Sequence, residues 1–389
     1  MRQAMKHKYL QIILALAFVL SCKQVYNPPN NSPDTGYLVV EGFISSGASP
    51  TSITLSRTVG LNETNAIIYE KNAALNIEGD NNDNFPLEEG VNGEYHSQPL
   101  TLNSTAKYRL HIKTGNGKEY VSDYATVKSG PPIDSVSWKR EDGGVRIYIN
   151  THDPNNNTKY YQWRYEETWE FYSAYQSTLR YTTDAQNVIT GVAYRYPNQT
   201  ADTTIYRCWN TVNSSNINIG SSEKLTSDVI YLPLIYIPGR SIKLSYLYSV
   251  NMRQIALSEQ AYRFMEKMKK NTEELGSIFD PQPSELQGNI HCVTNPSEIV
   301  IGFVEVSDEK QKRIFIRKDQ VPDWGYSPSC TTVEIDNIVD SIKKYGSGRI
   351  PTIAGKTSPF GSIITFYAAD PGCVDCTLSG TNVKPPFWP

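Results

Sequence analysis

The sequence predicts a mainly β protein. Its expected form is two β-sandwich-like regions of the fibronectin or immunoglobulin type, with one amphipathic helix at about residues 257–271 inserted in the second region. Short runs of β-forming residues recur along the chain, separated by turn signals rich in Gly, Pro and Asn. One segment stands out by its helical apolar period. Tyrosine is also abundant, with 26 residues, which suits an exported β-protein.

The N-terminal residues have the pattern of a bacterial export leader. A basic start precedes an unbroken apolar run over residues 12–20, too short to span a bilayer but right for the core of a signal peptide. Ser21 and Cys22 follow directly, and a small residue before a cysteine resembles the lipobox of bacterial lipoproteins. We therefore predict a signal peptide over residues 1–21 and lipidation of Cys22; an ordinary cleaved signal is the alternative.

Residues 22–36 are expected to form a lipid-anchored tether. Asn and Pro dominate residues 27–33, a composition that cannot build a core and stays extended. Acyl chains on Cys22 would hold the protein on a membrane outside the cytoplasm, and we expect the outer membrane. Lys23 and Gln24 replace the acidic signal that sends some lipoproteins to the cell surface. The membrane face stays open, with the cell surface preferred over the periplasmic side.

Charge excludes some classes of partner. The leader holds three of the 37 basic residues and none of the 40 acidic ones, so the mature chain has a net charge of −6. A negative chain without a basic cluster is a poor binder of nucleic acid. We expect no nucleic-acid partner.

Residues 37–130 are predicted to form an N-terminal β-sandwich domain. Residues 107–113 alternate cleanly, with Tyr108, Leu110 and Ile112 on one face. The turn at 115–117 leads into a second strand and completes a hairpin. Gly130 and the two prolines after it then break the pattern, which indicates a domain boundary.

Residues 131–389 are predicted to form a larger β-rich domain. Asp142-Gly143 indicates a hairpin turn, and residues 160–172 place aromatic side chains at odd positions. One aromatic face of a strand is better explained as core, because large exposed rings are costly. The alternative is a stacking platform, which makes three residues of this strand candidates for a ligand or partner surface: Trp163, Tyr165 and Trp169.

The predicted helix carries an apolar stripe formed by Leu257, Ala261, Phe264, Met265 and Met268. Ser258 can cap its start and Gly276 can end it. The stripe is expected to pack on a sheet, with docking of a partner as the alternative. The tail from Pro351 is rich in Gly, Pro and Ser, so we expect it to be irregular and fixed by disulfides.

Five cysteines remain beside the lipid-bearing one, in a compartment that permits disulfides. The odd number leaves one thiol unpaired, for which we select Cys292. A loop-like C-x-x-C at Cys373 and Cys376 favours structural bonds over redox or zinc chemistry. We expect disulfides among Cys208, Cys330, Cys373 and Cys376, with Cys330 bonded to either Cys373 or Cys376.

No catalytic constellation is visible. HExxH and G-x-S-x-G are absent, and the five histidines are scattered. Glu166 and Glu167 would point to opposite faces of one strand, so they could not flank a glycosidic bond. We expect no catalytic residue, metal or cofactor, and therefore no enzyme.

Several segments resemble, in their order, one family of Bacteroidota lipoproteins, domain-of-unknown-function family 4249. After the lipobox cysteine these segments are residues 131–136, 163–170, 207–209, the helix from 258 to 276, 276–281, 288–290 and the Cys373/Cys376 tail. Genes of this family typically lie beside those of TonB-dependent outer-membrane transporters. The resemblance implies a lipoprotein that captures ligand for such a transporter or covers its mouth, and it supplies no catalytic residues.

The leading hypothesis is therefore a non-enzymatic accessory subunit of a TonB-dependent transporter or another outer-membrane β-barrel complex. The Tyr and Trp content favours a first alternative, an independent glycan- or peptide-binding surface module. A second alternative is a hydrolase whose site is assembled from residues distant in sequence.

Overall fold

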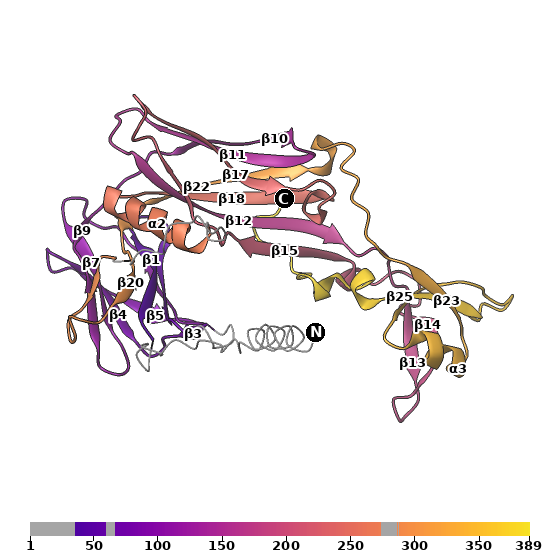
Figure 1. The fold of residues 1–389 in the computed structure, drawn as a ribbon. Helices are drawn as coiled ribbons and strands as arrows, with labels where there is room; N and C mark the ends of the chain where they lie inside the picture. Colours follow the sequence, from indigo (N-terminus) through magenta and orange to yellow (C-terminus); the bar gives the residue numbers. More distant parts are fainter. Residues whose placement is uncertain (1–35, 60–66, 274–285, 287) are drawn as a thin grey trace, which may run out of the picture.

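The computed structural model describes residues 36–59, 67–273, 286 and 288–389. The signal peptide, Cys22 and the tether up to residue 35 lie outside these residues. The chain is mainly β, as predicted, and its buried apolar side chains form three main cores. We call the parts around these cores the first body (residues 38–126 and 290–307), the second body (133–172, 207–256 and 309–317) and the third body (179–194 and 332–369). The first and third bodies lie at opposite ends of the second (Figure 1).

The first body is a twelve-stranded sheet curled around its own core, with the path β19-β8-β7-β4-β5-β6-β2-β1-β20. The predicted alternation in β7 is confirmed, because Tyr108, Leu110 and Ile112 are buried. Its strands are β1 (Leu38–Ser45), β2 (Pro50–Arg57), β3 (Ile68–Tyr69), β4 (Ala74–Gly79), β5 (Asn84–Glu89), β6 (Glu94–Pro99), β7 (Lys107–Lys113), β8 (Glu119–Ser122), β9 (Ala125–Thr126), β19 (Ile290–Cys292), β20 (Val300–Gly302) and β21 (Val306–Ser307).

The last three strands of this body come from far along the chain. β20 and β21 pair with β1 in parallel, and β19 pairs with β8. The predicted division at residue 130 missed this return, because these strands are short and their pairing partners lie more than 160 residues earlier. Two glycines permit the close approach: a Cβ at Gly288 would lie 1.6 Å from the carbonyl oxygen of Gly302, and one at Gly302 would lie 2.4 Å from that of Val40.

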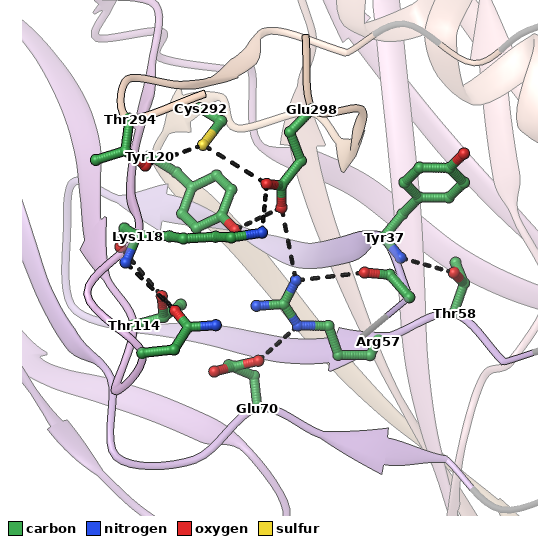
Figure 2. A network of polar contacts seen from close by, with 12 residues as sticks. Tyr37, Arg57, Thr58, Glu70, Thr114, Lys118, Tyr120, Cys292, Thr294 and Glu298 are labelled. Atoms are coloured by element: carbon green, nitrogen blue, oxygen red, sulfur yellow. Dashed lines mark hydrogen bonds and ion pairs between the residues drawn. The ribbon is translucent and has the colours of Figure 1, made fainter. Parts of the chain in front are cut away.

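A polar network fastens the returning segment (Figure 2). Glu298 accepts a hydrogen bond from Lys118 Nζ at 2.6 Å and from the Tyr120 hydroxyl at 2.7 Å. Arg57 lies 3.8 Å from the same carboxylate and pairs with Glu70 at 2.6 Å. Burial opposes the charge on Glu298, but the bonds from Lys118 and Tyr120 dominate and lower the pKa of this carboxyl. Glu298 is therefore held ionised between the two parts of the body.

The second body is a sandwich of two antiparallel sheets. One sheet has the order β10-β11-β17, from β10 (Ile133–Glu141), β11 (Gly144–Asp153) and β17 (Asp228–Ile237). The other has the order β15-β12-β18-β22, with β16 beside β12, from β12 (Tyr160–Tyr172), β15 (Arg207–Asn213), β16 (Asn218–Ser221), β18 (Leu247–Ala256) and β22 (Glu309–Arg317). Three 3₁₀ turns accompany it: η1 (Thr203–Ile205), η2 (Ile242–Leu244) and η3 (Lys318–Gln320).

Helix α2 (Glu259–Thr272) lies at the junction of the first and second bodies (Figure 1). Ser258 caps it as predicted, since its hydroxyl accepts a bond from the amide of Ala261 at 3.0 Å. The apolar stripe packs on the sheet that holds Tyr160 and Ile255, and Phe43 joins this cluster from the first body. The helix ends before the expected Gly276, which lies outside the described residues. Within the described part of the chain, no helix is long and apolar enough to cross a membrane.

The third body was not predicted as a separate unit. It joins the hairpin of β13 (Leu179–Thr183) and β14 (Ile189–Tyr194) to the sheet β23-β25-β24 around a core that includes Phe366. The expectation of an irregular tail from Pro351 was wrong up to Ala369, because β25 pairs with β23 and β24 pairs with β25. Its other elements are β23 (Thr332–Asp336), α3 (Val339–Ser341), η4 (Ile342–Gly346), β24 (Ile350–Ala354), β25 (Thr365–Ala369), η5 (Pro371–Cys373) and η6 (Cys376–Leu378).

Two disulfides fix the tail, as expected. Cys330 bonds to Cys373, and Cys208 bonds to Cys376 across 168 residues. Cys292 is the buried free thiol that was selected. The four candidate cysteines thus tie the tail to the second body and to the start of the third.

We predict that Glu298→Gln lowers the free energy of unfolding by about 2 kcal/mol at pH 7, because it removes the charge that Lys118 and Tyr120 hydrogen-bond at a largely buried position. Since the native pKa of Glu298 is lowered, its contribution is full above the unfolded-state pKa of about 4.3 and is lost as pH falls through the native value. Urea unfolding at pH 7, 4.5 and 3 should show that the free energy of unfolding of the wild type approaches that of the variant as the pH falls.

Glu119→Gln is the matched control. Glu119 forms a more exposed ion pair with Lys113 on the neighbouring strand, so its loss should cost less than about 1 kcal/mol. Equal losses for the two variants would show that the network does not fasten the returning segment.

Candidate functional site

The predicted aromatic surface on β12 is core. Trp163 is fully buried and its indole Nε1 donates to Gln254 Oε1 at 2.8 Å. Trp169 is 7% exposed, and Tyr165 packs partly buried against the same core. The odd positions of β12 face the opposing sheet of the sandwich, which covers them. The interpretation of these three residues as a ligand or partner surface is therefore wrong, and the core interpretation holds.

An exposed aromatic surface occurs instead on the outer side of the opposing sheet. It comprises Lys139 of β10, Arg146 and Tyr148 of β11, and Tyr231 and Tyr236 of β17, and we call it the tyrosine face. These strands are amphipathic, because their alternate residues, such as Ile147 and Ile235, fill the core.

The hairpin between β10 and β11 shapes one end of the tyrosine face. Asp142 and Gly143 both adopt positive φ, at 52° and 73°, which is the predicted type of two-residue turn. Gly144 then lets the Tyr236 ring approach, since a Cβ there would lie 2.7 Å from its Cε2 atom. The Tyr236 hydroxyl donates to the carbonyl of Asp142 at 2.7 Å, which fixes the ring.

The rings and cations of the tyrosine face contact one another in defined geometries. Tyr148 and Tyr231 stack with centroids 4.9 Å apart and planes 5° from parallel. Lys139 Nζ lies 5.2 Å and 5.5 Å from the two centroids, and the Arg146 guanidinium lies 5.1 Å from that of Tyr236. Tyr231 is 47% exposed and Tyr236 41%, whereas Tyr148 is covered by its immediate neighbours. Two of the three rings therefore present apolar area to solvent.

The charges at this face are partly neutralised. Tyr148 donates to Glu141 Oε2 at 2.6 Å, and this hydrogen bond, with desolvation, raises the pKa of Tyr148 to about 12. Arg146 pairs with Asp142 at 2.8 Å, which raises the pKa of Arg146. Lys139 forms no ion pair with any described residue. The face therefore combines neutral ring surfaces with one exposed cation, Lys139, which lies over two of the rings and has no carboxylate partner among the described residues.

Rings with polar edges and a neighbouring cation suit contacts with sugars, peptides or another protein. The hairpin of this sheet was predicted from its turn at Asp142-Gly143, whereas its exposed face was not predicted. The alternation of β17, in which Val229 and Tyr231 are exposed on either side of Ile230, was the signal that could have found it.

The carboxylates of β12 are engaged in ion pairs. Glu167 points into the core, where it binds Lys243 Nζ and the Tyr248 hydroxyl at 2.7 Å each. Glu170, on the other side of the strand, binds Arg207 at 2.5 Å and the Trp388 indole at 3.0 Å. Glu166 binds Arg313 at 2.9 Å on the side of the strand away from the core, so the opposite orientation predicted for Glu166 and Glu167 is observed. Among the residues that the structure describes, no cluster of three or more His, Cys, Asp or Glu could hold a metal ion.

We predict different stability losses for the two aromatic sets. Trp163→Ala should lower the free energy of unfolding by about 4 kcal/mol, because it empties a fully buried site. Tyr231→Ala should cost at most about 1.5 kcal/mol, the contribution of one stacked pair. Urea unfolding measures both, and similar losses would contradict the assignment of Tyr231 to a free surface.

Comparison with solved structures gives remote likenesses. A proposed carbohydrate binding protein from Bacteroides uniformis ATCC 8492 has 10% identity and a TM-score of 0.14, with 57% of this chain and 90% of that chain covered. The B domain of a biofilm associated protein has 9% identity and a TM-score of 0.14, with 75% and 91% covered. At these TM-scores neither likeness carries an argument about fold or function.

No match was found among curated proteins. The family model described as Domain of unknown function (DUF4249) matches residues 24–313. That match includes the first body, helix α2 and the tyrosine face, and it ends before the Cys373/Cys376 tail. The family expected from the sequence segments is therefore confirmed, and the chain belongs to the DUF4249 family.

Proposed function

We propose that this protein is a lipid-anchored, non-enzymatic accessory subunit of an outer-membrane β-barrel complex, with a TonB-dependent transporter as the expected barrel. The tyrosine face is the observation that carries the proposal, because it offers exposed rings and an exposed cation on a rigid sheet. Tyrosine is enriched at protein interfaces, where its ring is buried and its hydroxyl stays hydrogen-bonded.

Export is supported by the disulfides. Two bonds link four of the five cysteines that the structure describes, and such bonds persist in oxidising compartments outside the cytoplasm. The leader and Cys22 agree with this compartment. The acyl chains would hold the three bodies close to the membrane, where a barrel presents its loops.

Lipidation of Cys22 is tested by mass spectrometry of the protein from native membranes. We expect the chain to begin at Cys22 and to carry the added mass of acyl chains. Cys22→Ser should leave the membrane fraction, since it removes the anchor. An intact leader or an unmodified residue 22 would contradict the proposed location.

Partnership with a barrel is tested by affinity purification of the tagged protein from detergent-solubilised native membranes. We expect a barrel protein to co-purify with the wild type, and its recovery to fall about tenfold or more with Tyr231→Ala/Tyr236→Ala, because interface hot spots contribute about 2 kcal/mol each.

Tyr345→Ala is the matched control, since Tyr345 is 44% exposed on the third body and also lies beside a lysine, Lys344. This variant should recover the barrel as the wild type does. Recovery of no barrel with any variant under several mild detergents would count against the partnership.

The second candidate is an independent glycan- or peptide-binding module, favoured by the Tyr148–Tyr231 stack beneath Lys139. If this holds, the purified protein binds a polymer without any barrel, and Tyr231→Ala weakens that binding while Tyr345→Ala does not.

A further inference from the structure

A second surface lies on the opposite side of the second body. The even-numbered residues of β12 point away from the sandwich core, toward the side where α2 and the first body lie. At one end this side is closed by the contacts of Tyr160 and Ile255 with Phe43. At the other end Trp388 covers Glu170. Between these ends the sheet carries a row of polar residues.

Two arginines of this row lie directly opposite each other. Arg164 of β12 pairs in register with Arg253 of β18, and Gln311 of β22 continues the row. Directly opposed residues of an antiparallel pair have Cβ atoms about 5 Å apart, and like charges there are destabilising. Two arginines opposed in this way are stabilised by anions placed beside them.

The described residues do not supply that anion fully. Arg164 makes no hydrogen bond or ion pair with them. Arg253 has one weak contact, at 3.9 Å, to a carboxylate oxygen of Glu166. The other oxygen of Glu166 already binds Arg313 at 2.9 Å. The Nε atom of Arg253 is buried without a hydrogen-bond partner, and a buried donor left unpaired is costly.

Arg164 is an exposed residue on the side of β12 that faces the first body. The surrounding protein lowers the pKa of its guanidinium by desolvation, with Arg253 adding to the shift and Glu309 and Glu41 opposing it. We call the surroundings of Arg164 and Arg253, with Glu41 and Glu309 near them, the recess.

Glu41 relates this recess to the first body. Its negative charge raises the pKa of Arg164, and its side chain also lines a cavity of about 730 Å³ on the outer side of β1 and β2. The hydroxyls of Thr54 and Ser56 line the same cavity. Glu309 accepts a hydrogen bond from the Ser49 hydroxyl at 3.1 Å and, like Glu41, opposes the lowering of the Arg164 pKa. These two carboxylates therefore offset part of the positive charge of the arginines.

We propose that Arg164 and Arg253 together bind an oxyanion group, a carboxylate or a phosphate, of a ligand that enters this recess. Guanidinium groups bind such groups through paired, charge-assisted hydrogen bonds. An oxyanion between them would offset their mutual repulsion. The site is separate from the tyrosine face and does not depend on the proposed barrel.

The test is a titration of the full mature chain in detergent micelles, followed by the ¹⁵N resonances of the arginine Nε–H groups. The probes are malonate, inorganic phosphate and, as a neutral analogue, malonamide. We expect malonate or phosphate to shift the Arg253 signal saturably and malonamide to leave it unchanged. The anion with the higher affinity identifies the ligand group as carboxylate or phosphate.

Arg164→Gln should weaken this binding about tenfold or more, because it removes one pair of charge-assisted bonds. Arg180→Gln is the control, since Arg180 is an exposed arginine on β13 and should leave the titration unchanged. Without added anion, Arg164→Gln should raise the melting temperature, since it relieves the like-charge contact.

Shifts that do not saturate, or that are equal with malonamide or in Arg164→Gln, would overturn the proposal. A lower melting temperature of Arg164→Gln, together with no response of the wild type to either anion, would show that the arginine pair is structural.

Discussion

The return of residues 290–307 to the first body is the constraint on which the arrangement of the molecule depends. Glu298 holds it, because its carboxylate meets Lys118 and Tyr120 in a place where an unpaired charge would be costly. Once β20 lies beside β1, the chain must cross from β18 to the first body and back to β22. Helix α2 occupies that crossing and packs against both bodies. The recess beside Arg164 exists because the two bodies are fixed in this way.

The two faces of the second body differ because of what covers them. The rings on the odd positions of β12 meet the opposing sheet and form the core, with Trp163 bonded to Gln254. The outer side of that opposing sheet has no cover among the described residues, and there the rings of Tyr231 and Tyr236 remain exposed. Whether an aromatic side chain is buried or exposed thus depends on the side of the sheet on which it lies. The residue type alone does not determine this.

The disulfides connect parts that otherwise share few strands. Cys208 of β15 bonds to Cys376, and Cys330 bonds to Cys373. Because Cys373 and Cys376 are three residues apart, both bonds end in one short segment. This segment follows β25 directly and therefore ties the third body to the second. Beyond it, Trp388 donates to Glu170 and keeps the end of the tail on the sheet. The tail is therefore held by covalent and polar contacts together with the burial of Val374 and Trp388.

Local sequence determined the β class, the hairpin at Asp142-Gly143, the face of β7, the cap of α2 at Ser258 and the presence of one unpaired cysteine. These features depend on alternation, on turn chemistry or on counting, which act within a few residues or on composition. Only the tertiary structure decided the return of β19–β21, the third body, the partner of Cys330 and the opposed pair of Arg164 and Arg253. Each of these results from pairing between segments far apart in the chain, and the apolar pattern of one strand does not specify its neighbour.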